Sequence, residues 1–193
     1  RVIDACHHAH NVPTIPGNQD IKWLWTDKYA HVFPDDVNAY MPEKFLHGDF
    51  LLLCNHCENP PCVRVCPTKA TYRTEDGQIL VDKEKCIGCR ACMTACPYGA
   101  RSFNPETNVV EKCTLCNHLQ AAGEQPACVK ACCAHARFFG DIDDPESDVS
   151  KAVKAAGPEN VHAMRDVGNK PTVRYILHKK YGDWTEDQPK MLP

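Results

Sequence analysis

The cysteines of this chain, and above all their grouping, limit what it can fold into. The sequence has 14 cysteines among 193 residues, and all but Cys6 lie between Cys54 and Cys133. Disulfide frameworks are typical of short secreted chains, and neighbouring cysteines in CxxC loops pair only with strain. The spacing therefore favours metal binding over disulfide bonds.

Two of the cysteine groups have closely related spacings. The second group in the chain is Cys54-x2-Cys57-x4-Cys62-x3-Cys66-Pro67, and the third is Cys86-x2-Cys89-x2-Cys92-x3-Cys96-Pro97. The third has the spacing of the bacterial ferredoxin run. In such a run three cysteines bind one [4Fe-4S] cubane, and the fourth, followed by proline, binds the neighbouring cluster.

This crossed scheme predicts two complete sets of ligands. They are Cys54, Cys57, Cys62 and Cys96 for cluster 1, and Cys86, Cys89, Cys92 and Cys66 for cluster 2. A zinc site built from two CxxC pairs is the alternative, but it leaves half of these cysteines without a role. His56 lies inside the first CxxC pair, and we expect it to pack beside the ligands because the cysteine set is complete without it.

The fourth group, Cys113-x2-Cys116-x11-Cys128-x3-Cys132, has the same three-plus-one form with a longer central loop. Cys6 is placed like the fourth cysteine of a first group. A third cluster would then be held by Cys113, Cys116, Cys128 and Cys6. Cys133 follows Cys132 where proline follows in the other groups, and we favour a buried packing role for it over a ligand role.

Cys132 is left as one ligand of an incomplete fourth cluster. A first group spaced like the third would have a cysteine at position 2, where this sequence has Val2. Either the other ligands lie upstream with a different spacing, or the site is incomplete. Because the sequence starts with Arg1, we expect it to begin inside a domain. We expect three clusters to be fully ligated within this chain, and the cysteines imply a fourth in the complete protein.

The order of the groups predicts an α+β fold of two nested ferredoxin-like units with small antiparallel sheets and short helices. The inner unit, 50–107, holds the second and third groups, and the outer unit joins 1–12 to 108–142. Residues 70–73 and 79–81 predict a hairpin around an Asp-Gly turn. Residues 50–53 and 102–104 are the expected outer strands, and short helical turns should follow each cysteine run.

Two further segments are predicted outside these units. An irregular insertion, 13–49, carries many aromatic residues: Trp23, Trp25, Tyr29, Phe33, Tyr40 and Phe45. It could be a docking surface for a partner subunit or a cover packed over the clusters. The C-terminal extension, 143–193, should begin with a helix capped at Asp144-Pro145 and ended by Gly157-Pro158. The tail from Val161 should add an extended segment that includes 173–177 and should then wrap a neighbour.

Other functional classes find little support in the sequence. The formal net charge is -3, and Lys and Arg are scattered, which disfavours a nucleic-acid surface. No apolar run approaches the roughly 20 residues of a membrane-spanning helix, and no phosphate-binding loop or hydrolytic triad is recognisable. We therefore expect an electron carrier without a substrate site. Four cationic residues lie beside cluster ligands in the sequence. They either raise the reduction potentials of the clusters or are simply solvated charges: Lys69, Arg90, Arg101 and Lys112.

These motifs resemble a known family. The four groups, with Cys54-Asn-His-Cys57-Glu-Asn-Pro-Pro-Cys62 and Glu111-Lys112-Cys113-Thr114-Leu115-Cys116, are similar to the four-cluster iron-sulfur subunits that accompany molybdopterin oxidoreductases and quinone-handling membrane complexes. Within that family, segments 5–13, 21–25 and 138–147 most resemble the DsrO group of the DsrMKJOP complexes of sulfate reducers. The chain departs from the pattern by lacking the first three cysteines of group one and by Cys133.

The resemblance implies an electron-transfer subunit of a membrane-bound anaerobic respiratory complex, linked to sulfate or sulfite. Its implied partners are a polytopic quinone-handling membrane subunit and a multihaem cytochrome c. Its implied location is the periplasmic face of the membrane, reached by export of the folded protein. The alternative is the electron-transfer beta subunit of a molybdopterin-dependent reductase.

Overall fold

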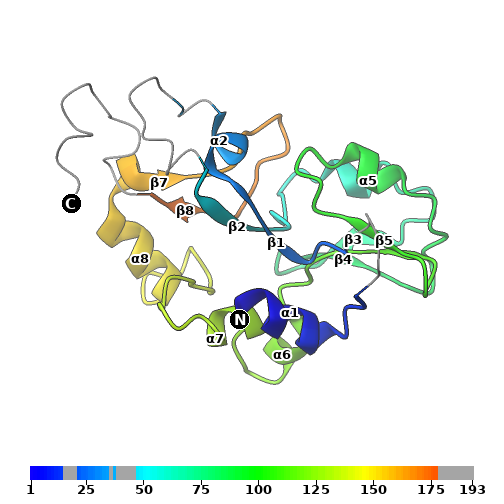
Figure 1. Ribbon diagram of the computed structural model, residues 1–193, viewed down its shortest axis with the longest axis horizontal. Coiled ribbons are helices and arrows are strands. Elements are labelled where there is room, and N and C mark those ends of the chain that lie inside the picture. Colours follow the sequence, from blue (N-terminus) through cyan, green and yellow to red (C-terminus); the bar gives the residue numbers. More distant parts are fainter. Residues whose placement is uncertain (15–20, 35–36, 38–46, 178–193) are drawn as a thin grey trace. The chain divides into compact units, whose positions relative to one another are not determined.

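The computed structural model describes residues 1–14, 21–34, 37 and 47–177 (Figure 1). The chain divides into two compact units. The cluster unit consists of residues 1–25, 53–139 and 166–172 and contains every cysteine, and the extension unit holds the described residues of 26–52, 140–165 and 173–193. This division does not separate the inner from the outer ferredoxin-like unit, so the nested arrangement stays a prediction.

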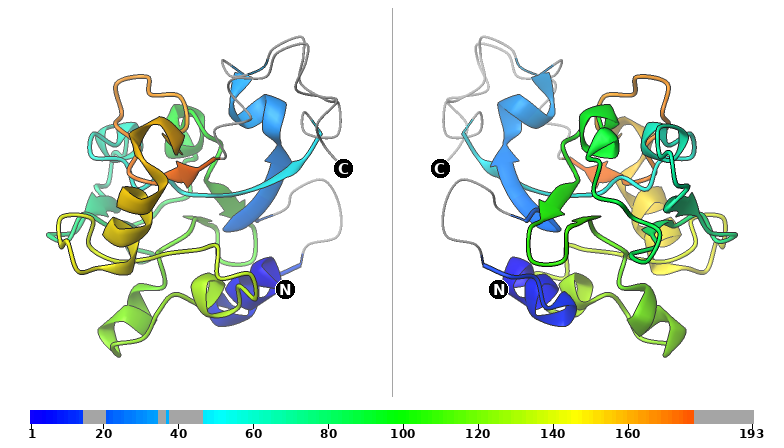
Figure 2. Two further views of the ribbon diagram at one scale, coloured as in Figure 1. Left: turned by 90° about the vertical axis from the view of Figure 1, so that its left-hand side faces the viewer. Right: turned by 90° about the vertical axis from the view of Figure 1, so that its right-hand side faces the viewer.

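Short helices dominate the cluster unit. They are α1 (Val2–His10), α4 (Pro61–Arg64), α5 (Ala91–Ala95), α6 (Asn117–Ala121) and α7 (Ala127–Lys130). Helix α4 packs against α5, and α1 packs against α7 (Figures 1 and 2). The helix of the second cysteine group is thus paired with that of the third, and the helix that carries Cys6 is paired with that of the fourth.

Two antiparallel ribbons complete this unit. Strand β3 (Thr71–Arg73) pairs with β4 (Ile79–Val81), with Thr71 opposite Val81, and the turn between them includes Gly77 at φ 85°. The predicted hairpin is therefore confirmed. Strand β5 (Ser102–Asn104) pairs with β6 (Val109–Glu111).

The expected outer strands form, but they do not flank the β3–β4 hairpin. Strand β2 (Asp49–Leu53) pairs with β1 (Leu24–Lys28), and the boundary between the two units falls within both strands. Strand β5 pairs with β6 because the intervening residues 105–108 are few enough to close a hairpin directly. Asn108 supports that turn with a left-handed φ of 56°.

The extension unit contains α2 (Tyr29–Val32), α8 (Asp148–Ala156), the 3-10 turn η2 (Pro158–Asn160), and the strand pair β7 (Val161–His162) and β8 (Tyr175–Ile176). Helix α8 begins at Asp148, later than the sequence predicts, because Ser147 is the N-cap and accepts a hydrogen bond from the Ser150 N–H. It ends before Gly157, as predicted. Strand β8 confirms the extended segment.

Most described aromatic residues of the insertion are buried. Trp23, Tyr29 and Phe33 are each 4–5% exposed, whereas Trp25 is only partly buried. Phe33 contacts the rings of Phe50 and Tyr175 at centroid distances of 5.3 and 5.6 Å. The buried rings favour a packing role over a docking surface. Tyr40 and Phe45 lie outside the described residues.

The apolar core of the cluster unit includes candidate ligands. Ile79 and Val110, each 1% exposed, pack with Cys62 and Cys92. The partly buried residues against this group are Val63, Cys86, Met93 and Phe103. Some of the candidate ligands are therefore part of the hydrophobic core of the cluster unit.

Candidate cluster-binding site

The three cysteine loops share one backbone feature. The residue that precedes the second cysteine of each loop has a left-handed φ: 41° at His56, 65° at Gly88 and 54° at Leu115. A left-handed residue turns successive N–H groups into a concave nest, a geometry found at phosphate and iron-sulfur sites. The loops are therefore built to surround an anionic group such as a thiolate-ligated cluster.

A second turn repeats after the fourth cysteine of each group. The N–H groups of Lys69, Gly99 and His135 donate to the carbonyls of Cys66, Cys96 and Cys132, at 3.3, 3.3 and 3.0 Å, and all three donors have left-handed φ. The third cysteine of each group lies inside a short helix: Cys62 in α4, Cys92 in α5 and Cys128 in α7. The helical turns thus fall within the cysteine runs rather than after them.

The thiols predicted for cluster 1 lie close together. Burial raises the pKa of the Cys57 thiol to about 11, against the lowering effect of the hydrogen bond from Asn169, and the nearby thiols of Cys54, Cys62 and Cys96 act in the same direction as burial. Cys54 differs from Cys57. Burial raises the pKa of its thiol, but the adjacent Lys112 and His56 side chains outweigh burial and bring that pKa to about 5.

Three of the thiols predicted for cluster 2 are also neighbours. Burial raises the pKa of Cys92, Arg101 lowers it, and the thiols of Cys86 and Cys66 raise it again. The remaining residue of the set, Cys89, is exposed and belongs to the same loop as Cys86 and Cys92. The Cys66 sulfur accepts a hydrogen bond from the Thr71 N–H at 3.4 Å.

The predicted third set is assembled by the packing of α1 on α7. Burial raises the pKa of Cys6, and the thiols of Cys113, Cys128 and Cys116 raise it further, so the structure brings Cys6 to the fourth cysteine group across more than a hundred residues of chain. Burial also raises the pKa of Cys113, to about 12.

Cys132 is buried and Cys133 is exposed. The expected packing role of Cys133 is therefore wrong. Cys133 is the second residue of the turn from Cys132 to His135 and occupies the place of Pro67 and Pro97, which are exposed in the other groups. The side chain at this step of the turn points to solvent in all three groups.

The donor chemistry fits [4Fe-4S] clusters, because the grouped side chains are thiols, the ligands that such clusters take. Among the described residues, no three His, Cys, Asp or Glu side chains are close enough to hold one metal ion. A cubane is a larger body, and its thiolate ligands are correspondingly farther apart. The grouped thiols and the N–H nests fit such a body.

Two of the four cations named from the sequence are buried between thiols of different sets. Lys112 is 1% exposed and donates to the carbonyls of Ile79 and Cys113. Burial lowers the pKa of Lys112, whereas the thiols of Cys54 and Cys113 raise it, so this side chain lies between the first and third sets. Lys69 and Arg90 are exposed.

Arg101 has the corresponding position between the first and second sets. Its side chain is 4% exposed and donates to the Thr71 hydroxyl at 3.2 Å. Burial lowers the pKa of Arg101, but the thiols of Cys62 and Cys92 outweigh burial and raise it. Two buried cations therefore separate the three groups of thiols.

Several polar contacts to sulfur were not predicted from the sequence. His10 Nε2 lies 3.1 Å from Cys116 Sγ, and its ring packs against Trp23 at a centroid distance of 4.2 Å, tilted by 32°. Burial, together with His118, lowers the pKa of His10 to about 4, so its ring is neutral near pH 7. Asn169 Nδ2 donates to Cys57 Sγ at 3.0 Å. Both contacts depend on residues far from the cysteine in sequence, so spacing could not reveal them.

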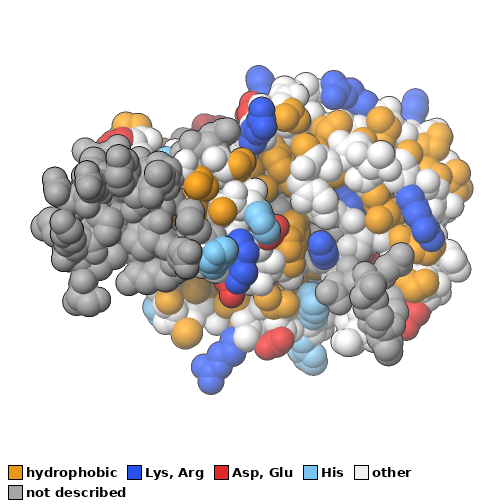
Figure 3. Space-filling view, turned by 45° about the horizontal axis from the view of Figure 1, so that its top comes forward, with side chains coloured by type: hydrophobic (Ala, Val, Ile, Leu, Met, Phe, Trp, Pro, Cys, Tyr) orange, Lys and Arg blue, Asp and Glu red, His pale blue; other side chains and the backbone are white. Residues whose placement is uncertain are grey.

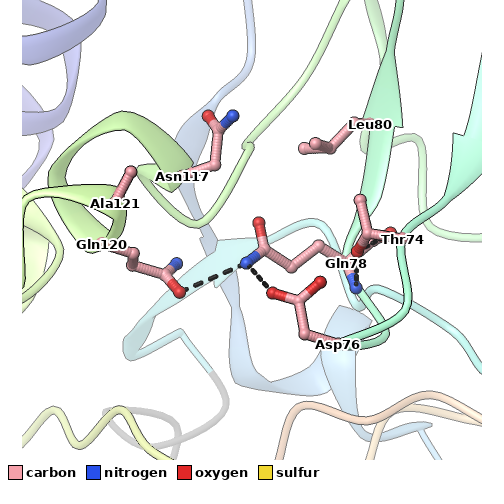
Figure 4. A pocket seen from close by; sticks show the side chains of 7 residues that line it. All are labelled: Thr74, Asp76, Gln78, Leu80, Asn117, Gln120 and Ala121. Atoms are coloured by element: carbon pink, nitrogen blue, oxygen red, sulfur yellow. Dashed lines mark hydrogen bonds between the residues drawn. The ribbon is translucent and has the colours of Figure 1, made fainter.

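Outside the cysteine loops, a hollow of about 400 Å³ lies between the β3–β4 turn and α6 (Figure 4). Its polar side chains largely bind one another: Gln78 Nε2 donates to Asp76 at 2.6 Å and to Gln120 at 3.2 Å. Lys and Arg side chains are dispersed over the face drawn in Figure 3. No described helix is both long and apolar enough to cross a bilayer.

Comparison with known proteins identifies the family. Residues 49–142 match the model of the 4Fe-4S dicluster domain. The chain is 40% identical over 203 residues to the Hdr-like menaquinol oxidoreductase iron-sulfur subunit 1 of Archaeoglobus fulgidus, with 89% of this chain and 70% of the relative covered. It is 32% identical over 221 residues to the arsenate respiratory reductase iron-sulfur subunit of a Shewanella species, with 90% of this chain and 84% of the relative covered.

Other relatives are longer than this chain. A tetrathionate reductase subunit of Salmonella typhimurium is 47% identical over 131 residues, which cover 64% of this chain and 50% of the relative. The chain thus spans about half the length of that protein. Identity above 30% over more than two thirds of the Archaeoglobus and Shewanella subunits is decisive, and this chain belongs to the family of iron-sulfur subunits with a 4Fe-4S dicluster domain.

Proposed function

We propose that this chain carries electrons along a row of [4Fe-4S] clusters within a larger respiratory complex, without a substrate site of its own. The observation that carries this proposal is the gathering of distant cysteine thiols into sets inside repeated N–H nests. Each cubane, when bound, supplies one-electron redox chemistry.

The proposed ligands are those of the crossed scheme. Cluster 1 is held by Cys54, Cys57, Cys62 and Cys96; cluster 2 by Cys86, Cys89, Cys92 and Cys66; and cluster 3 by Cys113, Cys116, Cys128 and Cys6. The pairings of α4 with α5 and of α1 with α7 support this scheme, because crossed ligation requires the helices of the two groups that exchange a ligand to lie together.

The buried cations support a linear order with cluster 1 in the middle. Arg101 is near thiols of sets 1 and 2, and Lys112 is near thiols of sets 1 and 3. In a water-poor interior, a positive charge beside a ligand favours the more negative, reduced state of the site. Ile79, Ala70 and Ala100, each 1% exposed, help to exclude water there.

Cys132 belongs in our proposal to a fourth cluster, whose other ligands are not among the cysteines of this chain. Its burial is compatible with that role, and it lies two residues after α7, the helix that packs against α1. Iron and acid-labile sulfide approaching four cubanes per polypeptide in the complete natural protein would support it.

For the wider assembly we favour a DsrO-type subunit in a membrane complex linked to sulfate or sulfite, at the periplasmic face. Its partners would be a polytopic quinone-handling subunit and a multihaem cytochrome c. The relative named as a menaquinol oxidoreductase subunit supports this choice, because its name refers to quinol oxidation and it is 40% identical over 89% of this chain.

The second candidate is the beta subunit of a molybdopterin-dependent reductase. It is supported by the matches to arsenate and tetrathionate reductase subunits. In both assemblies this chain would do the same work, so the distinction depends on partners.

One experiment separates the candidates. The complex is isolated anaerobically by a tag on this chain, and iron, sulfide, molybdenum and covalent haem are quantified together with the copurifying subunits. Covalent haem and a polytopic subunit would favour the first candidate, and molybdenum with a large catalytic subunit would favour the second. A colourless chain free of sulfide would overturn both.

A further inference from the structure

Residues 166–172 return from the C-terminal part of the chain and form a strap on the loop of the second cysteine group. The N–H groups of Glu58 and Asn59 donate to the carbonyls of Lys170 and Asn169, at 2.9 and 3.1 Å. The Thr172 N–H donates to the Asn55 carbonyl at 3.0 Å. These bonds fix the strap against the loop that carries Cys54 and Cys57.

The strap is itself a braced turn. The Asp166 carboxylate accepts hydrogen bonds from the N–H groups of Gly168 and Lys170, at 2.9 and 3.0 Å. Gly168 has φ 89°, a conformation that favours glycine. The residue held at the tip, Asn169, is therefore presented in one orientation.

Asn169 is 2% exposed, and its amide group has a defined direction. The Val167 N–H donates to Asn169 Oδ1 at 3.2 Å, so the amide nitrogen faces the other way. One N–H of Nδ2 points at Cys57 Sγ, 3.0 Å away, and the other at the Tyr98 hydroxyl oxygen, 2.8 Å away. Every hydrogen-bonding group of this buried amide is in use.

We propose that Asn169 sets the reduction potential of cluster 1 and that Tyr98 is its positioning residue. This inference rests on the proposed function, in which Cys57 is a ligand of cluster 1. An N–H donor to a ligand sulfur stabilises the state with more negative charge, so it raises the potential. The effect is confined to one cluster, because Cys57 belongs to a single ligand set.

The test is a set of reduction potentials measured on the anaerobically purified protein by redox titration with electron paramagnetic resonance. The variant Asn169→Leu keeps the side-chain size and removes both N–H donors. We expect it to disfavour reduction of cluster 1 about tenfold, which is about 59 mV for a one-electron couple. The other potentials should not move. A Cys57→Ser variant assigns the cluster 1 signal.

Two further variants distinguish the amide from the strap. Asn59→Ala removes the bond from Asn59 Nδ2 to the Gly168 carbonyl, 2.7 Å, but keeps the backbone bonds that hold the strap and the donor to sulfur. It should leave all potentials unchanged. Tyr98→Phe keeps the Asn169 donor but removes one of the bonds that orient its amide, and should lower the cluster 1 potential by less than Asn169→Leu does.

The outcomes separate the inference from the function. Clusters present with an unchanged cluster 1 potential in Asn169→Leu would overturn the inference alone, as would an equal shift in Asn59→Ala. If Asn169→Leu fails to fold, the Tyr98→Phe result decides, and an unchanged potential there overturns the inference. Wild-type protein without iron and sulfide would overturn the proposed function as well.

Discussion

Gly88 offers a sharp test of the loop geometry, because Gly99 is a matched control. Both glycines have left-handed backbones, with φ of 65° and 60°. A Cβ added at Gly88 would lie 2.4 Å from the Asn108 carbonyl oxygen and 3.1 Å from the Phe103 ring, whereas a Cβ at Gly99 would meet nothing within 4 Å. The two alanine variants therefore share the conformational cost and differ in the clash.

The expected magnitudes follow from these contacts. A left-handed alanine costs about 1–2 kcal/mol, partly offset by about 0.4–1 kcal/mol from the restricted unfolded chain. At Gly99 nothing more is added. At Gly88 the carbonyl belongs to the backbone and cannot rotate away, so overpacking adds about 1–3 kcal/mol or more. We expect Gly88→Ala to cost roughly 1–5 kcal/mol in total once the offset is subtracted, mostly as displacement of the loop from Cys86 to Cys92.

The assay compares the two variants under anaerobic conditions. Iron and sulfide per chain and the electron paramagnetic resonance spectrum report cluster content, and thermal unfolding at one heating rate reports stability. For a chain of this size each kcal/mol shifts the unfolding midpoint by about 2–4 °C. Gly88→Ala should lose cluster 2 and unfold several degrees lower, while Gly99→Ala should keep all clusters.

Equal cluster contents and midpoints in the two variants would refute this reasoning. So would a Gly88→Ala protein that loses the cluster predicted at Cys54 and Cys57 while retaining the one at Cys86 and Cys92. Either result would mean that the close approach of Asn108 to the cysteine loop does not govern cluster 2.

Three other predictions follow from the same structure. Cys96→Ser should damage cluster 1 more than cluster 2, because Cys96 is a ligand of cluster 1 in the crossed scheme, and the electron paramagnetic resonance signals of the two clusters measure this. Cys133→Ser should change neither signal, because Cys133 is exposed. Ser147→Ala should destabilise the extension unit by about 0.5–2 kcal/mol in denaturant unfolding, because it removes the N-cap bond of α8, with Ser150→Ala as a comparison. Iron removal by a chelator should reduce hydrogen-exchange protection in the cysteine loops before the β3–β4 hairpin, and equal loss everywhere would contradict this order.

The cysteine spacing predicted much of the architecture because cluster ligation is a local rule that leaves a sequence trace. Three cysteines that reach one cubane must lie in a short loop, and the fourth lies one helical turn further. The hairpin around Gly77 and the end of α8 at Gly157 were predictable for a similar reason, since glycine marks turns and helix ends.

Contacts between distant segments left no such trace. Strand β2 pairs with β1 and not with the central hairpin, a choice made by tertiary packing rather than by either strand's residues. Asn169 contacts a sulfur more than a hundred residues away, and an isolated asparagine in a turn is normally read as a turn former. The burial of Arg101 and Lys112 was equally hidden, because charged residues are usually solvated.

The left-handed residues show how the loops are held. Gly88 must be glycine because of the nearby Asn108 carbonyl, yet the equivalent positions carry His56 and Leu115, which adopt the same φ at a cost of about 1–2 kcal/mol each. Non-glycine residues remain in such conformations only where the surroundings fix them, and these sites are commonly functional. Here both left-handed residues contact the side chain of a cysteine. The Leu115 N–H donates to Cys113 Sγ at 3.4 Å, and Cys54 lies beside the His56 ring. The loop conformation and the orientation of the thiols therefore depend on each other, so assembly of the clusters and folding of the cysteine loops should be a single coupled process.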